Sequence, residues 1–127
     1  MNWEISSSFI VQSSNMPIKC DEYGQVCVIT LNGDFVGEDI AAARKAVEDA
    51  IDGKQIVDFV VDFEKCGFVD SEGLETLVWI RKRTDDLFGQ VKLSTFDENV
   101  KTILEITRLA QRFECHEELA GALKTMR

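Results

Sequence analysis

The chain has 127 residues, of which 45% are hydrophobic and 29% are charged, and its net charge is −9. This length suits one globular domain with a hydrophobic core. The acidic balance argues against binding to nucleic acid, which needs clustered Lys and Arg, and against binding to an anionic membrane surface. It favours a protein partner that presents basic residues.

The cysteine and histidine content points away from a metal or cofactor site. No two cysteines have the C-x-x-C spacing of a zinc site, and the chain holds a single histidine, His116. We therefore expect no metal, no cofactor, and reduced thiols as in a cytoplasm. The N-terminus lacks the basic start and the long apolar stretch of a signal peptide. No apolar run reaches the length of a membrane span. The expected location is the cytoplasm, without membrane insertion.

Residues 1–15 form a serine-rich segment that we interpret as an N-terminal extension to a domain over residues 16–127. A loose arm, an added strand and a contact with another subunit are all open for this segment. After it, the runs MPIKC and QVCVITL predict two strands joined by a turn at DEYG. Cys27 lies inside the second run and is expected to pack as a small hydrophobe.

A first helix is predicted over about residues 40–52. Asp39 is placed to cap the start of this helix, and Asp52 with Gly53 is placed to end it. Apolar residues recur along one face of the predicted helix, namely Ile40, Ala43, Val47, Ala50 and Ile51.

The run IVDFVVDF at residues 56–63 is almost continuously apolar, which is typical of an inner strand of a sheet covered by helices. A second helix follows over about residues 72–86. Its predicted buried stripe consists of Leu74, Leu77 and Val78. The run VKLSTF then predicts the next strand.

The last third of the chain predicts a helix, a short strand and another helix. Asp97 caps a helix over about residues 97–109, and RFEC predicts an edge strand. HEELAGALKTM predicts a closing helix that begins at His116. Helices and strands therefore alternate after an initial pair of strands. This order predicts an α/β fold in one domain, with a small mixed, mostly parallel sheet of four to five strands and about four helices.

Several catalytic motifs are missing from the sequence. It contains no G-x-S-x-G elbow and no G-x-x-x-x-G-K-[ST] phosphate loop. A Ser–His–Asp triad would depend on His116 alone. A phosphate-accepting receiver domain fits poorly with the initial pair of strands. These catalytic and phosphate-accepting alternatives are therefore disfavoured.

The stretch FVDSEGLETLVW places a serine hydroxyl where an apolar run becomes helical. Either Asp70 or Ser71 can cap the helix that follows. Gly73, inside the first helical turn, costs roughly 1 kcal/mol relative to alanine, which a close approach of another backbone or side chain would explain. A helix start at the carboxyl end of an inner strand is also where open α/β sheets place their sites. A structural cap alone stays open as an explanation of the corner, while Gly73 and the position of the helix start favour a functional serine.

The segment VVDFEKCGFVDSEGLETLVWIRKRT resembles the central motif of the STAS domain, in particular that of bacterial anti-sigma factor antagonists. VCVITLNGDFV resembles the preceding strand and loop of that family, and the C-terminal half of the chain is similar as well. The resemblance covers about residues 16–125. It implies a regulatory protein that is not an enzyme.

The resemblance also implies a switch between protein partners. In that family the unphosphorylated form binds an anti-sigma factor that is also a serine kinase, which frees the sigma factor. The kinase phosphorylates the serine after the motif's aspartate, here Ser71, and a metal-dependent serine phosphatase restores the binding form. Asp70 is the motif's acid, and Asp34 is the acid of a neighbouring loop in the binding surface. Glu72 and Gly73 complete the implied partner-binding residues.

Glu72 stands where the family has a second serine, which removes an alternative phosphate acceptor and places a carboxylate beside Ser71. An alternative function is therefore a constitutive STAS scaffold in a larger sensory or transport assembly, in which Ser71 only caps a helix. A nucleotide-binding module that uses the helix N-terminus for phosphate is disfavoured by the missing glycine-rich loop. A homodimer is one alternative for the oligomeric state.

Overall fold

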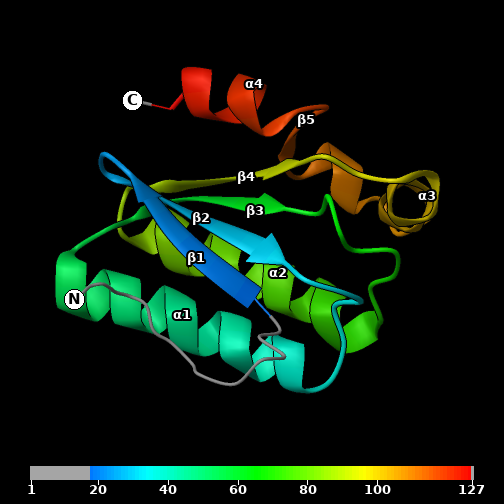
Figure 1. Ribbon diagram of the computed structural model, residues 1–127, viewed down its shortest axis with the longest axis horizontal. Helices are drawn as coiled ribbons and strands as arrows, with labels where there is room; N and C mark the ends of the chain where they lie inside the picture. Colours follow the sequence, from blue (N-terminus) through cyan, green and yellow to red (C-terminus); the bar gives the residue numbers. More distant parts are fainter. Residues whose placement is uncertain (1–17, 127) are drawn as a thin grey trace.

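The computed structural model describes residues 18–126, so the N-terminal extension expected over residues 1–15 lies outside the described residues. The described chain contains one five-stranded sheet in which the strands follow one another in chain order (Figure 1). The first two strands are antiparallel, and the other neighbours are parallel. The expected small, mixed and mostly parallel sheet is confirmed. Its strands are β1 (Ile18–Tyr23), β2 (Val26–Leu31), β3 (Asp58–Asp62), β4 (Gln90–Ser94) and β5 (Glu114–His116).

Helices cover both faces of the sheet (Figure 1). Helices α1 (Glu38–Lys54) and α2 (Ser71–Asp86) pack side by side on one face, and the short helix α4 (Leu119–Lys124) lies on the other. Helix α3 (Glu98–Ile106) and the 3-10 helix η1 (Leu109–Gln111) follow β4 beyond its carboxyl end. The alternation of strands and helices confirms the expected α/β fold.

The inner strand β3 is buried on both faces, as its apolar run predicted. Phe59 and Val61 join the main core under α1 and α2, whereas Val60 points to the opposite face, because successive strand residues alternate. Cys27 also lies in the main core and is 3% exposed, which confirms that it packs as a small hydrophobe. The smaller cluster under α4 consists of Val26, Val28, Val60, Ala122 and Met126.

A buried lysine ties the last helix to the sheet. Lys92 of β4 is 3% exposed, and its Nζ lies 2.9 Å from Glu114 Oε2 on the neighbouring strand. The same ammonium donates to the backbone carbonyl and the hydroxyl of Thr125, just after α4. His116 Nε2 lies 2.7 Å from the same Glu114 oxygen. Hydrogen bonds from Lys92 and then His116 hold the pKa of Glu114 below its ordinary value.

Replacing Glu114 by glutamine should lower the stability in a pH-dependent way. We expect Glu114→Gln to cost about 1–2 kcal/mol at neutral pH, because the buried Lys92 loses its charged acceptor. The pKa of Glu114 is lower in the folded state, so its contribution is present above the unfolded pKa and is lost as pH falls through the folded pKa. Urea unfolding at a series of pH values checks this. An unchanged difference between variant and wild type at acid pH would contradict the assignment.

The first helix differs from its prediction at both ends. Helix α1 begins at Glu38, so Asp39 lies inside it and does not cap it, and no side chain caps this start. The helix also continues past Gly53 to Lys54 and ends at Gln55, which adopts a left-handed backbone with φ of 54°. The predicted end was wrong because Gly53 keeps a helical φ and the stop falls two residues later.

The strand ends also depend on pairing that the local sequence does not show. β1 continues through Tyr23, which pairs with Val26, so the predicted turn at residues 21–24 shrinks to residues 24–25. His116 was predicted to open the last helix, but it belongs to β5, and its carbonyl accepts a hydrogen bond from Thr95 N at 3.0 Å. Helix α4 is therefore shorter than predicted.

The buried face of α2 is rotated relative to its prediction. Leu77 is fully buried as expected, but Leu74 is only partly buried and Val78 is 36% exposed. Helix α2 contacts both α1 and β4, so the face between them is the one that is covered. The buried residues of α2 are Gly73, Thr76, Leu77, Ile80 and Thr84.

Candidate functional site

The corner before α2 is capped by Asp70. Its Oδ1 accepts a hydrogen bond from the backbone N–H of Gly73 at 2.8 Å, which satisfies one of the free donors of the first helical turn. Ser71 is the first residue of α2 and is exposed. Its hydroxyl makes no hydrogen bond to any of the described residues. The sequence left the cap open between Asp70 and Ser71, and the structure decides for Asp70.

Removing each of these two side chains should therefore have different effects on stability. We expect Asp70→Ala to lower the free energy of unfolding by about 1 kcal/mol, because an N-cap is lost. Ser71→Ala should change it by less than about 0.5 kcal/mol, because the exposed hydroxyl contributes no hydrogen bond to the fold. Urea denaturation of both variants beside wild type is the measurement. Equal destabilisation by both changes would speak against Asp70 as the cap.

Gly73 allows the loop after β2 to pack directly against the corner. A Cβ on Gly73 would lie 2.7 Å from the Phe35 carbonyl oxygen and 2.7 Å from Val69 Cγ1, closer than real Cβ atoms approach. The close approach predicted for this glycine is thus confirmed. Phe35 pairs with Val69 in an isolated parallel bridge, and the N–H of Phe35 donates to the Phe68 carbonyl at 2.8 Å. These contacts hold the loop that carries Asp34 against the segment before α2 and against Gly73.

A third loop brings an acid that the sequence analysis identified only as a helix cap. A Cβ on Gly67 would lie 3.7 Å from Asp34 Oδ1 and 3.6 Å from Asp97 Oδ2, so these two carboxylates flank Gly67. Asp97 Oδ1 caps α3 by accepting from Val100 N, and Asn99 Nδ2 donates to the Gly67 carbonyl at 2.7 Å. Loops after parallel strands meet at one edge of a sheet, and this rule could have grouped Asp97 with Asp34 in advance.

Phe68 adds an apolar side chain to this edge and was also missed by the sequence analysis. It is 43% exposed, while its neighbour Val69 is buried. An exposed aromatic residue beside charged groups is a common element of protein-binding surfaces. We call this edge of the molecule the corner surface. Its members are Asp34, Gly67, Phe68, Asp70, Ser71, Glu72 and Asp97.

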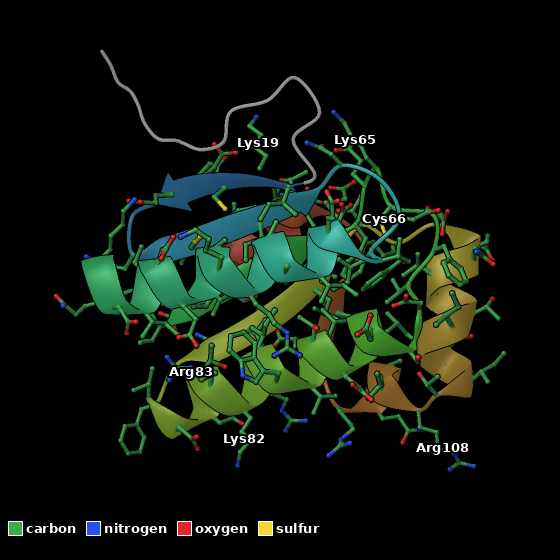
Figure 2. All side chains as sticks on the ribbon, turned by 90° about the horizontal axis from the view of Figure 1, so that it is seen from below. Lys19, Lys65, Cys66, Lys82, Arg83 and Arg108 are labelled. Atoms are coloured by element: carbon green, nitrogen blue, oxygen red, sulfur yellow. The ribbon has the colours of Figure 1, made fainter. Side chains whose placement is uncertain are left out.

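The chemistry of the corner surface is acidic and offers no activated nucleophile. Cys66 is buried and donates its thiol to the Phe68 carbonyl (Figure 2). Burial, followed by the charges of Asp34 and Asp97, raises the pKa of this thiol, so it stays protonated at neutral pH. Among the described residues, no group of three or more His, Cys, Asp or Glu side chains is placed to hold a metal ion. The exposed side chains of the corner surface are Asp34, Phe68, Ser71, Glu72 and Asp97.

A family model named STAS domain matches residues 17–122 of the chain. The chain belongs to the STAS domain family. This match confirms the resemblance that the central motif suggested. No curated protein sequence is detectably similar to this STAS domain. Within residues 18–126, no helix is both long enough and apolar enough to cross a membrane.

Solved structures share the fold of this STAS domain at low sequence identity. A candidate anti-sigma factor antagonist from Thermotoga maritima superposes with a TM-score of 0.80 at 20% identity, covering 87% of this chain and 94% of that one. The phosphorylated form of the Bacillus cell fate determinant SpoIIAA gives 0.71 at 16%, with coverages of 87% and 99%. A sulfate transporter family protein from Wolinella succinogenes gives 0.66 at 13%, with coverages of 80% and 84%. These likenesses show the fold.

Proposed function

We propose that this STAS domain is a non-enzymatic partner switch of the anti-sigma factor antagonist type, controlled by phosphorylation of Ser71. The observation that carries the proposal is that Asp70, and not Ser71, caps the helix at this corner. Asp70 caps α2 through Gly73 N, so the exposed hydroxyl of Ser71 is free to accept a phosphate without loss of a structural bond. The fold likeness to anti-sigma factor antagonists supports the same role.

The partner that fits the corner surface combines basic and apolar groups. Asp70 and Glu72 are the chain neighbours of Ser71, the Asp34 carboxylate lies next to Gly67, and Phe68 has an exposed ring. Gly73 keeps these elements together by allowing the Phe35 loop to pack against α2. Opposite charges on the partner would steer and orient the complex. In our proposal the partner is an anti-sigma factor with serine kinase activity, and a serine phosphatase reverses the modification.

Phosphate on Ser71 changes the surface without requiring a change of fold. A phosphoserine adds about −1.5 to −2 charges at pH 7. The positive end of α2 offsets part of this charge, by roughly 0.3–1 kcal/mol at an exposed site. In a complex, however, the phosphate stands between Asp70 and Glu72, where a closely fitted partner meets added bulk and added negative charge. The affinity should therefore depend on phosphorylation while the domain remains folded.

The direct test is incubation with the cognate kinase and ATP, followed by localisation of the phosphate by mass spectrometry. We expect one phosphate, on Ser71, because Glu72 replaces the neighbouring serine of the family motif. The Ser71→Ala variant should remain unmodified. Phosphate found elsewhere, or none on Ser71 under conditions in which the kinase modifies itself, would contradict the proposal.

A constitutive scaffold is the second candidate function. The fold likeness to a sulfate transporter family protein and the carboxylate of Glu72 beside Ser71 favour it. In this case the corner surface would bind its partner permanently, and Ser71 would carry no phosphate. Phosphorylated Ser71 recovered from cells would count against the scaffold, and a partner that binds Ser71→Asp as tightly as wild type would support it.

A further inference from the structure

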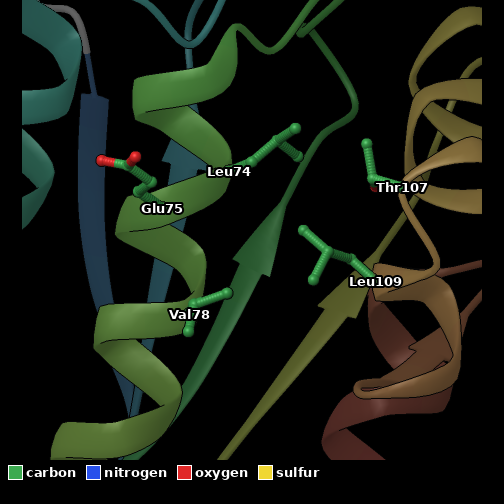
Figure 3. Close-up of a pocket in the computed structure, with 5 residues that line it drawn as sticks. All are labelled: Leu74, Glu75, Val78, Thr107 and Leu109. Carbon is green, nitrogen blue, oxygen red and sulfur yellow. The ribbon is translucent and has the colours of Figure 1, made fainter.

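An open apolar groove runs between α2 and the segment that joins α3 to η1 (Figure 3). Leu74 and Val78 on α2 point toward Thr107 and Leu109 on the other side, while the Glu75 carboxylate points away from them. The groove has a volume of about 320 Å³. An apolar cavity of about 150 Å³ is enough to hold a benzene ring, so this groove can accommodate an aromatic side chain.

Two cations lie close in the chain to residues that line the groove, although the lining itself also includes the acid Glu75. Lys82 follows Val78 by one helical turn on α2, and Arg108 lies between the lining residues Thr107 and Leu109. Both side chains are exposed and project from the same side of the molecule (Figure 2). Neither forms an ion pair with any of the described residues. The groove therefore combines an apolar floor with positive charge beside it, which suits an acidic segment that carries an aromatic residue.

The turn between α2 and β4 is such a segment. Phe88 at its tip is 96% exposed, and Leu87 beside it is 37% exposed. The two residues before them are Asp85 and Asp86, both exposed. Asp85 approaches Arg81 at 3.6 Å, whereas Asp86 makes no ion pair within the described chain. We call residues 85–88 the acidic tip.

Phe88 has a backbone conformation that is unfavourable for any residue with a side chain. Phe88 has a left-handed φ of 63°, a position that glycine usually takes at the end of a helix. The glycine stands one residue later instead, because a Cβ on Gly89 would lie 1.9 Å from the Val57 carbonyl oxygen. Phe88 therefore adopts a strained conformation and gains almost no burial in return. A contact outside its own domain would explain why an aromatic residue occupies this position.

We propose that the acidic tip of one copy of this protein docks into the groove of a second copy. The Phe88 ring fits the apolar floor, and Asp85 and Asp86 complement Lys82 and Arg108. The Phe88 ring cannot reach its own groove, because even Val78, the nearer lining residue of α2, lies about 12 Å from Asp86 along the same helix. The contact is therefore between copies, and it joins two different surfaces in a head-to-tail arrangement. It does not depend on the function proposed for Ser71.

The contact has a consequence for the corner surface. Ser71, Leu74, Glu75 and Val78 follow one another at helical spacing, so the groove continues the side of α2 that begins at Ser71. A second copy seated in the groove would lie next to the corner surface. A contact as small as one tip in one groove is weak and is populated only at high protein concentration.

Sedimentation velocity of the full chain over a range of concentrations, up to about 1 mM, tests the proposal. We expect wild type to self-associate, and Phe88→Ala and Val78→Asp each to weaken the association at least about tenfold. The decisive sample is an equimolar mixture of these two variants. Phe88→Ala retains the groove and Val78→Asp retains the tip, so the mixture should form a dimer and nothing larger. Tyr23→Ala, which removes another exposed aromatic side chain, should associate as wild type does.

Two further variants keep the test independent of folding defects. Lys82 is exposed, so Lys82→Glu should leave the fold intact and still weaken the association. Phe88→Gly should raise the melting temperature, because the left-handed position is relieved, and should also abolish the association. A wild-type chain that stays monomeric at the highest concentration would overturn the proposal. So would association that survives Phe88→Ala, or variants that fail to complement each other when mixed.

Discussion

Gly73→Ala should lower the free energy of unfolding by about 1–3 kcal/mol, although alanine is the better helix former. The added Cβ would lie 2.7 Å from both the Phe35 carbonyl oxygen and Val69 Cγ1. The Val69 side chain can move, but the backbone carbonyl can move only if the loop shifts away from α2. That shift would strain the bridge between Phe35 and Val69 and the hydrogen bond from Phe35 N to the Phe68 carbonyl.

The matched control for this change is Gly53→Ala. Gly53 is also helical, but nothing lies within 4 Å of a Cβ built on it. The control should therefore raise the stability by about 0.5–1 kcal/mol through helix propensity alone. Urea denaturation of the two variants gives opposite signs if the close contact at Gly73 is real. A stabilising effect at both positions would mean that α2 does not pack against the Phe35 loop as described.

Gly73→Ala should also weaken partner binding if Asp34 belongs to the binding surface as proposed, because the displaced loop carries Asp34 away from Gly67. Binding measured well below the unfolding transition separates this effect from loss of folded protein. A variant with destabilised packing but unchanged affinity would show that Asp34 lies outside the binding surface.

Phosphorylation of Ser71 should lower the affinity for the proposed partner, an anti-sigma factor, by about a thousandfold, while the stability of the domain changes little. A like-charge clash at an interface costs several kcal/mol, and roughly 4 kcal/mol already corresponds to three orders of magnitude in affinity. Asp70 and Glu72 precede and follow the modified residue, so the phosphate adds to existing negative charge, and the helix dipole offsets only part of it. Calorimetric titration of both forms with the partner measures the ratio, and thermal unfolding of both forms measures stability.

Ser71→Asp and Ser71→Ala are the matched pair for this prediction. The aspartate adds one charge at the start of α2 and should weaken binding by at least about tenfold. The alanine removes the acceptor without adding charge, so it should bind nearly as wild type does and resist the kinase. Equal affinities for Ser71→Asp and Ser71→Ala would refute control by charge and favour the scaffold.

The strands and helices could be predicted because each depends mainly on a local pattern. The unbroken apolar run that became β3 predicted an inner strand, and apolar spacing predicted the buried face of α1, including Val47. The predictions failed where the packing of distant parts of the chain determines whether a residue is paired or buried. His116 has a helix-like sequence after it, yet pairing with β4 keeps it in a strand. Val78 has the spacing of a core residue, yet no element covers it fully.

Some residues of the candidate site could be identified from the sequence, and others only from the structure. Asp70, Ser71 and Gly73 were identified from their position at a strand-to-helix corner, which is visible in one short stretch. Asp97 was recognised only as a cap, although its place after a parallel strand could have grouped it with Asp34. The sequence does not show that both carboxylates flank Gly67, because this depends on how the loops after β2 and β4 pack. Phe68 was not singled out, because an exposed and a buried aromatic residue look alike in a sequence.

The order of the elements, the family motif and the acidic residues around Ser71 can be recognised without a structure, since they follow from local periodicity and short-range residue types. The packed fold was needed to show that Asp70 caps α2 and that the Ser71 hydroxyl takes no part in the cap. It also placed Phe88 on an exposed, strained turn, at the opposite end of α2 from Ser71. The physical reason is that caps, close approaches and exposure depend on which distant segments pack together, and that packing is a property of the whole fold.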